Sequence, residues 1–356
     1  MKNYWIIGLL FLFSNCSLER FISSNQKDKS MDIFLFIGQS NMAGVAKIGN
    51  LDTVTLTNVY LLNDSNLWEK AKNETNAGFN RYSSVKGKTH RLSISYTFSR
   101  KVSTYTGRKI GVVSNARGAT GIGQWQKNYQ GLDDYNLYEE AVRRTKAALA
   151  LNPGSKVKGI IWHQGESDNA KAKSEIYMKR LQKLVKDFRA DLGDNKIAFI
   201  AGEVGKWKNR GQGVNPVIRQ IKANIPYSGW ISSDGLTSLN LEKNDPHFDT
   251  YSQRVFGGRY ADIAIELIYD LSFGGVELFT EIGFKGRSVT LKEGDYSMRD
   301  IESEGIRGDE IQSLKIMPDY EIIFIFADKN VESMHLLSDT DNLLLNELSL
   351  LRVRKL

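Results

Sequence analysis

The chain has 356 residues, of which 41% are apolar and 25% charged, and its formal net charge is +7. These values are close to the averages of globular proteins and leave room for one large domain or two smaller ones. The Lys and Arg residues are scattered, and no basic run is interleaved with aromatic residues, so the composition argues against nucleic-acid binding. The single cysteine excludes a disulfide within the chain.

Residues 1–16 have the pattern of an export signal. Lys2 precedes the apolar stretch WIIGLLFLF, which is too short to span a bilayer and is typical of a secretory signal. Cys16 follows, as in bacterial lipoprotein signals, so we expect it to be lipidated and to anchor the protein to a membrane of the cell envelope, on the periplasmic or the surface side. Plain secretion is the alternative, and a free or buried thiol is a third. Residues 17–30 are mostly polar and predict a tether.

From residue 31 onward, apolar strands alternate with helical patterns. Continuous apolar runs predict strands at residues 33–37, 109–114, 157–163, 196–202 and 229–233. Helical spacing predicts helices at 138–151, from Tyr177 to Phe188, at 215–225 and from Thr250 onward, where Thr250 and Gln253 form a capping box. Strands buried on both faces and separated by helices favour a parallel sheet in an α/β fold. Ligands of such sheets bind beyond the carboxyl ends of the strands.

The pattern changes near Gly275. Downstream of it we find short β runs such as VELF, SVTL, SLKI and YEIIFIF, and no long helical period. We therefore expect an α/β domain at residues 31–272 and a small all-β Greek-key domain at residues 275–356.

Four polar stretches lie at or just after strand ends, or before the last helix. They are Gly38-Gln39-Ser40-Asn41, NARGATGIGQW, WHQGESDN and NDPHFD. Together they supply a serine, a histidine, acids and glycines with exposed N–H groups, which is the set that acyl transfer needs.

A serine nucleophile needs a base within hydrogen-bond distance and donors for the oxyanion. We expect Ser40 to be the nucleophile and His247 the base, with an oxyanion hole formed by the Ser40 and Gly118 N–H groups and the Gln164 side chain. The alternatives are that Ser40 caps a helix and that His247 is a surface loop residue. His163 is better explained as a packed, hydrogen-bonded histidine than as the base.

The candidate substrate-binding residues are the two amides that flank the serine, Gln39 and Asn41, together with Arg117 and Trp125. Structural packing is an equally good explanation for Arg117 and Trp125. No His, Cys and Asp cluster has metal-ligand spacing, and the glycines of RGATGIG do not follow the phosphate-loop pattern. We therefore expect neither a metal ion nor a cofactor.

The blocks GQSNMAG, ARGATGIGQW, WHQGESD and DPHFDTYSQRVFGGRYA occur in this order. This combination resembles the sialate O-acetylesterase-like branch of the SGNH hydrolases, which includes the acetylxylan esterases of carbohydrate esterase family six. The resemblance covers about residues 31–270. It implies a flavodoxin-like three-layer α/β/α fold and metal-free deacetylation of carbohydrates, with Ser40 as nucleophile, His247 as base and Gly118 at the oxyanion hole. Met42 departs from the G-x-S-x-G elbow of α/β-hydrolases, which excludes that fold.

The residue that orients the histidine is open at this stage. SGNH enzymes usually carry the acid three residues before the histidine, where this chain has Asn244, which cannot hold a negative charge. Two acids remain: Glu166 of the QGE block and Asp245, two residues before the histidine. We favour Glu166 and keep Asp245 as the alternative.

The segment LFTEIGFKGRSVTLKEGDYSM resembles a βγ-crystallin Greek-key motif, with Phe279, Phe284, Gly286 and Ser288 at its characteristic positions. Gly308-Asp309 and Gln312-Ser313 keep only part of the calcium-binding pattern of that family, so calcium is the less favoured expectation. The alternative is a β-sandwich that supports the enzyme or docks a glycan.

These observations predict a carbohydrate O-acetylesterase that removes acetyl groups from a polysaccharide or a sialic acid through an acetyl-enzyme. A glycan-binding lipoprotein without catalysis is one alternative, favoured by the missing acid at position 244. A lipase or thioesterase of the wider SGNH group is another.

Overall fold

The computed structural model describes residues 30–356 except 86, 88, 89, 131–135, 272–274, 318, 319, 329–332, 337, 344 and 346. The expected signal segment, Cys16 and all but the last residue of the tether lie outside the described residues. Within these ranges, no helix has both the length and the apolar character that crossing a bilayer requires.

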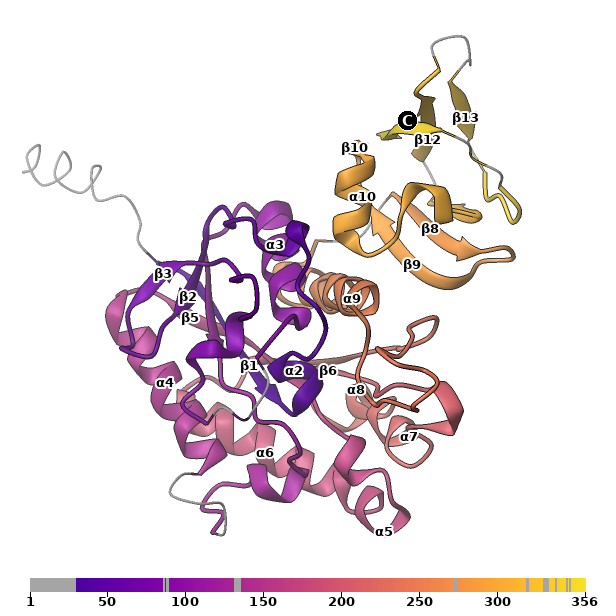
Figure 1. Ribbon diagram of the computed structural model, residues 1–356. Coiled ribbons are helices and arrows are strands. Elements are labelled where there is room, and N and C mark those ends of the chain that lie inside the picture. Colours follow the sequence, from indigo (N-terminus) through magenta and orange to yellow (C-terminus); the bar gives the residue numbers. More distant parts are fainter. Residues whose placement is uncertain are drawn as a thin grey trace, which may run out of the picture.

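A central sheet of seven strands organises the larger part of the chain (Figure 1). Its spatial order is β3-β2-β4-β1-β5-β6-β7. All neighbouring strands are parallel except β2 and β3, which are antiparallel. The strands are β1 (Asp32–Gly38), β2 (Val59–Leu62), β3 (Trp68–Lys70), β4 (Ile110–Ser114), β5 (Lys156–His163), β6 (Ala198–Gly202) and β7 (Ser228–Ile231).

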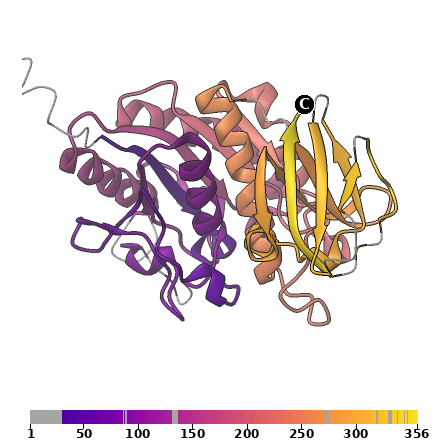
Figure 2. The same cartoon turned by 90° about the horizontal axis from the view of Figure 1, so that it is seen from above.

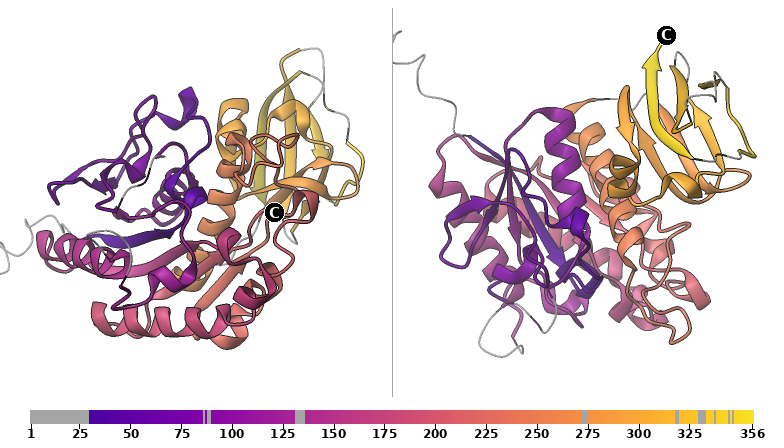
Figure 3. Two further views of the ribbon diagram at one scale, coloured as in Figure 1. Left: turned by 60° about the horizontal axis from the view of Figure 1, so that its bottom comes forward. Right: turned by 45° about the horizontal axis from the view of Figure 1, so that its top comes forward.

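Helices cover both faces of this sheet (Figures 1 and 3). Side chains of β1 point alternately to the two faces of the sheet, and both faces are apolar. Phe34 and Phe36 belong to the buried apolar cluster on one face, and Ile33, Leu35 and Ile37 belong to the cluster on the other. The first cluster includes α3 (Ile94–Thr106) and α9 (Thr250–Tyr269), and the second includes α4 (Leu137–Leu151) and α6 (Tyr177–Leu192). The expected three-layer α/β/α fold is confirmed.

Two local expectations are wrong. Asp249, not a Thr250–Gln253 box, caps α9, because the Asp249 carboxylate accepts the Ser252 N–H at 2.7 Å. The helix expected at 215–225 is two short helices, α7 (Asn215–Ile218) and α8 (Ile221–Asn224). The sequence analysis also did not identify α3, β2 and β3.

Two antiparallel sheets form the C-terminal part, as expected for an all-β region (Figure 2). One has the order β11-β8-β9, the other β10-β14-β12-β13, and a short helix, α10 (Met298–Glu304), accompanies them. The strands are β8 (Val276–Glu281), β9 (Lys285–Leu291), β10 (Gly294–Ser297), β11 (Ser313–Ile316), β12 (Tyr320–Phe326), β13 (Met334–Leu336) and β14 (Leu348–Lys355).

The apolar side chains of these sheets belong to the same buried cluster as the α3 and α9 layer. Arg100 of α3 also forms an ion pair with Glu304 of α10 at 2.9 Å. The C-terminal sheets therefore pack directly on the α/β part. The boundary expected between residues 272 and 275 stays a prediction, since residues 272–274 are not among those described.

Candidate active site

A sharp turn at the carboxyl end of β1 presents Ser40. Gly38 has φ +139°, and a Cβ at this position would overlap the His163 carbonyl group. Glycine is therefore required for β1 to lie so close to the end of β5. The Gln39 N–H then donates to the His163 carbonyl at 2.9 Å, and Ser40 begins the short helix α2 (Ser40–Ala43) with its side chain partly exposed.

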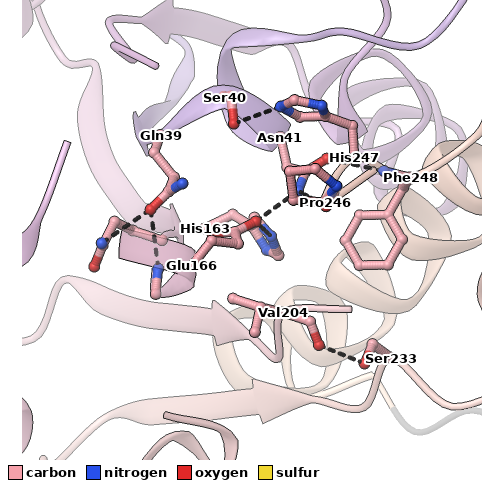
Figure 4. Close-up of polar contacts among 12 residues, drawn as sticks. Gln39, Ser40, Asn41, His163, Glu166, Val204, Ser233, Pro246, His247 and Phe248 are labelled. Carbon is pink, nitrogen blue, oxygen red and sulfur yellow. Dashed lines mark hydrogen bonds and ion pairs between the residues drawn. The ribbon is translucent and has the colours of Figure 1, made fainter. Parts of the chain in front are cut away.

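The loop between β7 and α9 brings His247 to this serine. His247 Nε2 lies 2.9 Å from Ser40 Oγ, a contact drawn in Figure 4. On the other side of the ring, Nδ1 lies 2.6 Å from Asp245 Oδ1, and the same oxygen accepts the His247 N–H at 2.8 Å. A carboxylate at Nδ1 keeps the proton there and leaves Nε2 free to accept the serine proton.

Glu166 does not make the contact that we expected of it. Its Oε1 accepts from Asn41 Nδ2 at 2.6 Å and lies 3.5 Å from His163 Nε2. We therefore correct the preferred orienting acid from Glu166 to Asp245. The physical reason is that a spacing of two residues lets the Asp245 carboxylate fold back onto the backbone and the ring of His247.

A second loop fixes the position of the acid. The Trp207 indole N–H donates to the Asp245 carbonyl at 2.8 Å, and its ring packs edge-on against Phe248. Arg210 donates to the Asn244 carbonyl and side chain. Neither Trp207 nor Arg210 was among the expected site residues, and no local signal identifies them, because they lie more than 30 residues before the acid in the sequence.

Two of the three expected oxyanion donors lie together. A Cβ built on Gly118 would be 3.6 Å from Ser40 Cβ, so the two backbones are adjacent. Within the described ranges, neither the Ser40 N–H nor the Gly118 N–H donates to a backbone carbonyl. Both N–H groups are therefore candidates for binding an oxyanion beside the serine.

Gln164 does not fit the expected oxyanion role. It is fully buried, and its Nε2 lies 2.6 Å from Asp168 Oδ2 and 3.0 Å from both Gln39 Oε1 and the Thr120 carbonyl. These acceptors use its amide protons. We therefore remove Gln164 from the expected donor set.

The expected substrate-binding residues have different locations. Trp125 is fully buried, donates to Thr120 Oγ1 and packs edge-on against Trp162, so packing is its role. Gln39 and Asn41 are also buried, and their side chains bond to the protein. Arg117 is partly exposed, and its backbone N–H donates to the Gly38 carbonyl at 3.0 Å, so it remains a candidate near the serine.

Ala119, next to the Gly118 donor, is exposed and has φ +59°, a left-handed conformation that disfavours a Cβ. We expect Ala119→Gly to raise the free energy of unfolding by about 1 kcal/mol, measured by thermal or denaturant unfolding. Ala223→Gly is the matched control, because Ala223 is exposed in α8, where glycine should lower stability instead. A loss of stability in both variants would contradict the prediction.

In the described part of the chain, no group of three or more His, Cys, Asp or Glu side chains is arranged to hold a metal ion. The chemistry available at this site is that of a serine with a histidine base, an aspartate and two backbone donors. These groups lie at the carboxyl ends of the strands of an α/β/α sheet, where such sheets bind their ligands.

Residues 30–266 match the model of the family described as carbohydrate esterase, sialic acid-specific acetylesterase, and the chain belongs to this family. The expected resemblance is thereby confirmed at the level of family. The description of this family names carbohydrate esterases.

Individual relatives show how far the similarity extends. A probable 9-O-acetyl-N-acetylneuraminic acid deacetylase of Escherichia coli K12 is 41% identical over 59 residues, which are 17% of this chain and only 18% of that protein. A protein from Arabidopsis thaliana has 23% identity and a TM-score of 0.57, covering 67% of this chain and 99% of its own. NanS has 14% identity and a TM-score of 0.52, covering 68% and 98%. At these identities the two structures show the fold alone.

Proposed function

We propose that this protein is a carbohydrate O-acetylesterase that works through an acetyl-enzyme, with Ser40 as nucleophile. The 2.9 Å contact between Ser40 Oγ and His247 Nε2 carries this proposal, since it joins residues 207 positions apart in the sequence. A base that is itself held by a carboxylate is what a serine hydroxyl needs to become nucleophilic at neutral pH.

In the proposed reaction, Ser40 Oγ attacks the acetyl carbonyl carbon and its proton passes to His247 Nε2. The Ser40 and Gly118 N–H groups stabilise the oxyanion. The tetrahedral intermediate then releases the sugar oxygen, which takes the proton from His247. Water, deprotonated by His247, attacks the acetyl-enzyme, and acetate leaves as Ser40 recovers its proton.

For the substrate we propose an O-acetylated sialic acid first and an acetylated polysaccharide second. The family description and the name of the Escherichia coli relative support the sialic acid. Arg117, whose backbone N–H donates to the carbonyl of Gly38 two residues before Ser40, is the candidate side chain for a substrate carboxylate, because a guanidinium binds carboxylates with two parallel hydrogen bonds.

Acetate release from a panel of esters tests the proposal. We expect release from 9-O-acetyl sialic acid to exceed release from acetylated xylan, and both to exceed hydrolysis of long-chain p-nitrophenyl esters. The Ser40→Ala variant controls for contaminating activity. Glycan binding without any Ser40-dependent turnover would favour the non-catalytic alternative, and faster turnover of long-chain esters would favour a lipase or thioesterase.

We also propose that the protein is exported and lipid-anchored through Cys16, and that the C-terminal sheets are a βγ-crystallin-like module. The signal pattern of residues 1–16 and the motif around Phe279 and Gly286 support these proposals. Incorporation of a labelled fatty acid into the wild type and equally into Cys16→Ser would exclude the anchor. A calcium-induced rise in melting temperature would test the less favoured metal site of the module.

A further inference from the structure

The side chain of Asn41, the residue after the nucleophile, reaches the loop of the base. Its Nδ2 donates to the Pro246 carbonyl at 3.1 Å, and its Oδ1 accepts the Phe248 N–H at 3.1 Å. Asn41 follows Ser40 directly, while Pro246 and Phe248 flank His247. The Asn41 amide therefore links the segment that carries Ser40 to the residues immediately before and after His247 (Figure 4).

The amide makes these bonds in only one of its two orientations. Nδ2 faces two acceptors, the Pro246 carbonyl and Glu166 Oε1, the latter at 2.6 Å. Oδ1 faces donors, the Phe248 N–H and Gln253 Nε2. Rotating the amide by 180° would put oxygen against oxygen and nitrogen against nitrogen, in a site where Asn41 is 2% exposed.

Glu166 is the charged group that selects this orientation. Its carboxyl is nearly buried, its Oε2 has no hydrogen-bond partner among the described residues, and no Lys or Arg of the described chain forms an ion pair with it. Burial by itself would raise the pKa of the Glu166 carboxyl, but the neighbouring His163 and the Asn41 amide lower it overall. His163 and Asn41 are thus the neighbours that favour the ionised form of this carboxyl.

The ring of His163 faces Tyr260 through Nδ1 and Glu166 through Nε2. Burial raises the pKa of Tyr260 far above its usual value, so its phenol keeps its proton, and the hydroxyl donates to the Trp162 carbonyl at 2.7 Å. His163 Nδ1, 3.2 Å from the same hydroxyl, is then a donor. His163 Nε2 lies 3.5 Å from Glu166 Oε1, and neither this nitrogen nor Glu166 Oε2 has a hydrogen-bond partner among the described residues.

We propose that Glu166 and Asn41 are positioning residues: the His163–Glu166 pair orients the Asn41 amide, and the amide sets the alignment of Ser40 with His247. Neither residue touches the substrate in this proposal. The inference rests on the proposed function for its catalytic meaning, but the alignment of Ser40 and His247 is measurable without a sugar ester.

Glu166→Gln tests the pair, because it removes the negative charge that faces the Asn41 amide and His163, and because its amide can present nitrogen instead of oxygen to Asn41. We expect it to lower the rate of Ser40 labelling by a fluorophosphonate, and kcat for p-nitrophenyl acetate, by roughly 10- to 100-fold with KM nearly unchanged. Asn41→Asp should have a larger effect, because it places a carboxylate oxygen against Glu166 and the Pro246 carbonyl.

The sharper measurement combines both changes. In the Asn41→Asp background, Glu166→Gln supplies an amide donor to the new carboxylate, so the double variant should label faster than Asn41→Asp alone. The same substitution should therefore slow labelling in one background and accelerate it in the other. A residue that acts independently of Asn41 would instead change the rate by the same factor in both.

Glu203→Gln is the matched control. Glu203 is fully buried at the end of β6, bonds to Arg219 and Lys206 at 2.6 Å, and makes none of the contacts of Asn41. We expect its effect to fall on thermal stability and to be equal in both backgrounds. If Asn41→Asp does not fold, Asn41→Ala replaces it, and Glu166→Gln should then have no further effect on labelling.

An equal slowing by Glu166→Gln in both backgrounds, or no slowing in either, would overturn the inference. The proposed function fails separately: if the wild type is labelled at Ser40 but releases acetate from no ester, the esterase assignment is lost. The labelling rates still test the positioning roles in that case.

Discussion

Substitution of Ser40 by alanine is expected to lower kcat for acetyl-ester hydrolysis by about a million-fold, as loss of the nucleophile does in other serine hydrolases. The reason is that no acetyl-enzyme forms without the hydroxyl that lies 2.9 Å from His247 Nε2. The backbone donors at Ser40 and Gly118 remain in the variant, so a small rate above the uncatalysed reaction should persist. Acetate release under single-turnover conditions measures both quantities.

Ser65→Ala is the control for this experiment, because Ser65 is exposed and its hydroxyl contacts only the neighbouring Asp64 among the described residues. Its kcat should equal that of the wild type. Ser40→Ala activity within about tenfold of the wild type would remove Ser40 as the nucleophile, since a loss that small is far below what removal of a nucleophile costs.

Asp245→Asn is expected to lower kcat by about three to four orders of magnitude, because an amide at this position no longer holds the productive tautomer of the imidazole. In the structure, Asp245 Oδ1 accepts from both His247 Nδ1 and the His247 N–H. An amide nitrogen in its place would favour a proton on Nε2, the atom that must accept from Ser40. The loss should appear in kcat more than in KM.

Measuring Asp245→Asn and Glu166→Gln side by side decides which acid orients the base. We expect the Asp245 variant to lose at least tenfold more activity than the Glu166 variant. The opposite ranking would return Glu166 to the role that the sequence alone favoured. Asp64→Asn, at an exposed position, is the control for a neutral amide replacing a surface carboxylate.

The local patterns of the chain predicted most of the sheet. The apolar run at residues 33–37 became β1, and the runs at 109–114, 157–163 and 196–202 became β4, β5 and β6 with small shifts of their ends. Each of these strands is buried on both faces, so its apolar run is continuous and easy to identify. The strands β2 and β3 are harder to identify: the apolar run of β2 has only four residues, and β3, at the edge of the sheet, has only three residues and two of them are charged.

Side chains were harder to place than strands. Trp125 follows the second polar block, and its sequence position is equally compatible with a sugar-binding surface and with a core. Only the packing of Trp162 against it, together with the Thr120 hydroxyl, places it in the interior. The residues next to an aromatic side chain do not show whether it lines a sugar-binding surface or packs in the core, because both environments are formed by elements elsewhere in the chain.

By itself, the sequence determined the alternation that builds the sheet, the glycine turn before Ser40 and the order of the polar blocks, because each depends on neighbours within a few residues. The tertiary structure alone decided which acid meets His247 and which amide joins it to the serine. Those contacts depend on loops from β6 and β7 that meet β1 only after folding. The free energy that holds them comes from hydrogen bonds between residues far apart in the chain, such as Asn41 with Pro246 and Trp207 with Asp245.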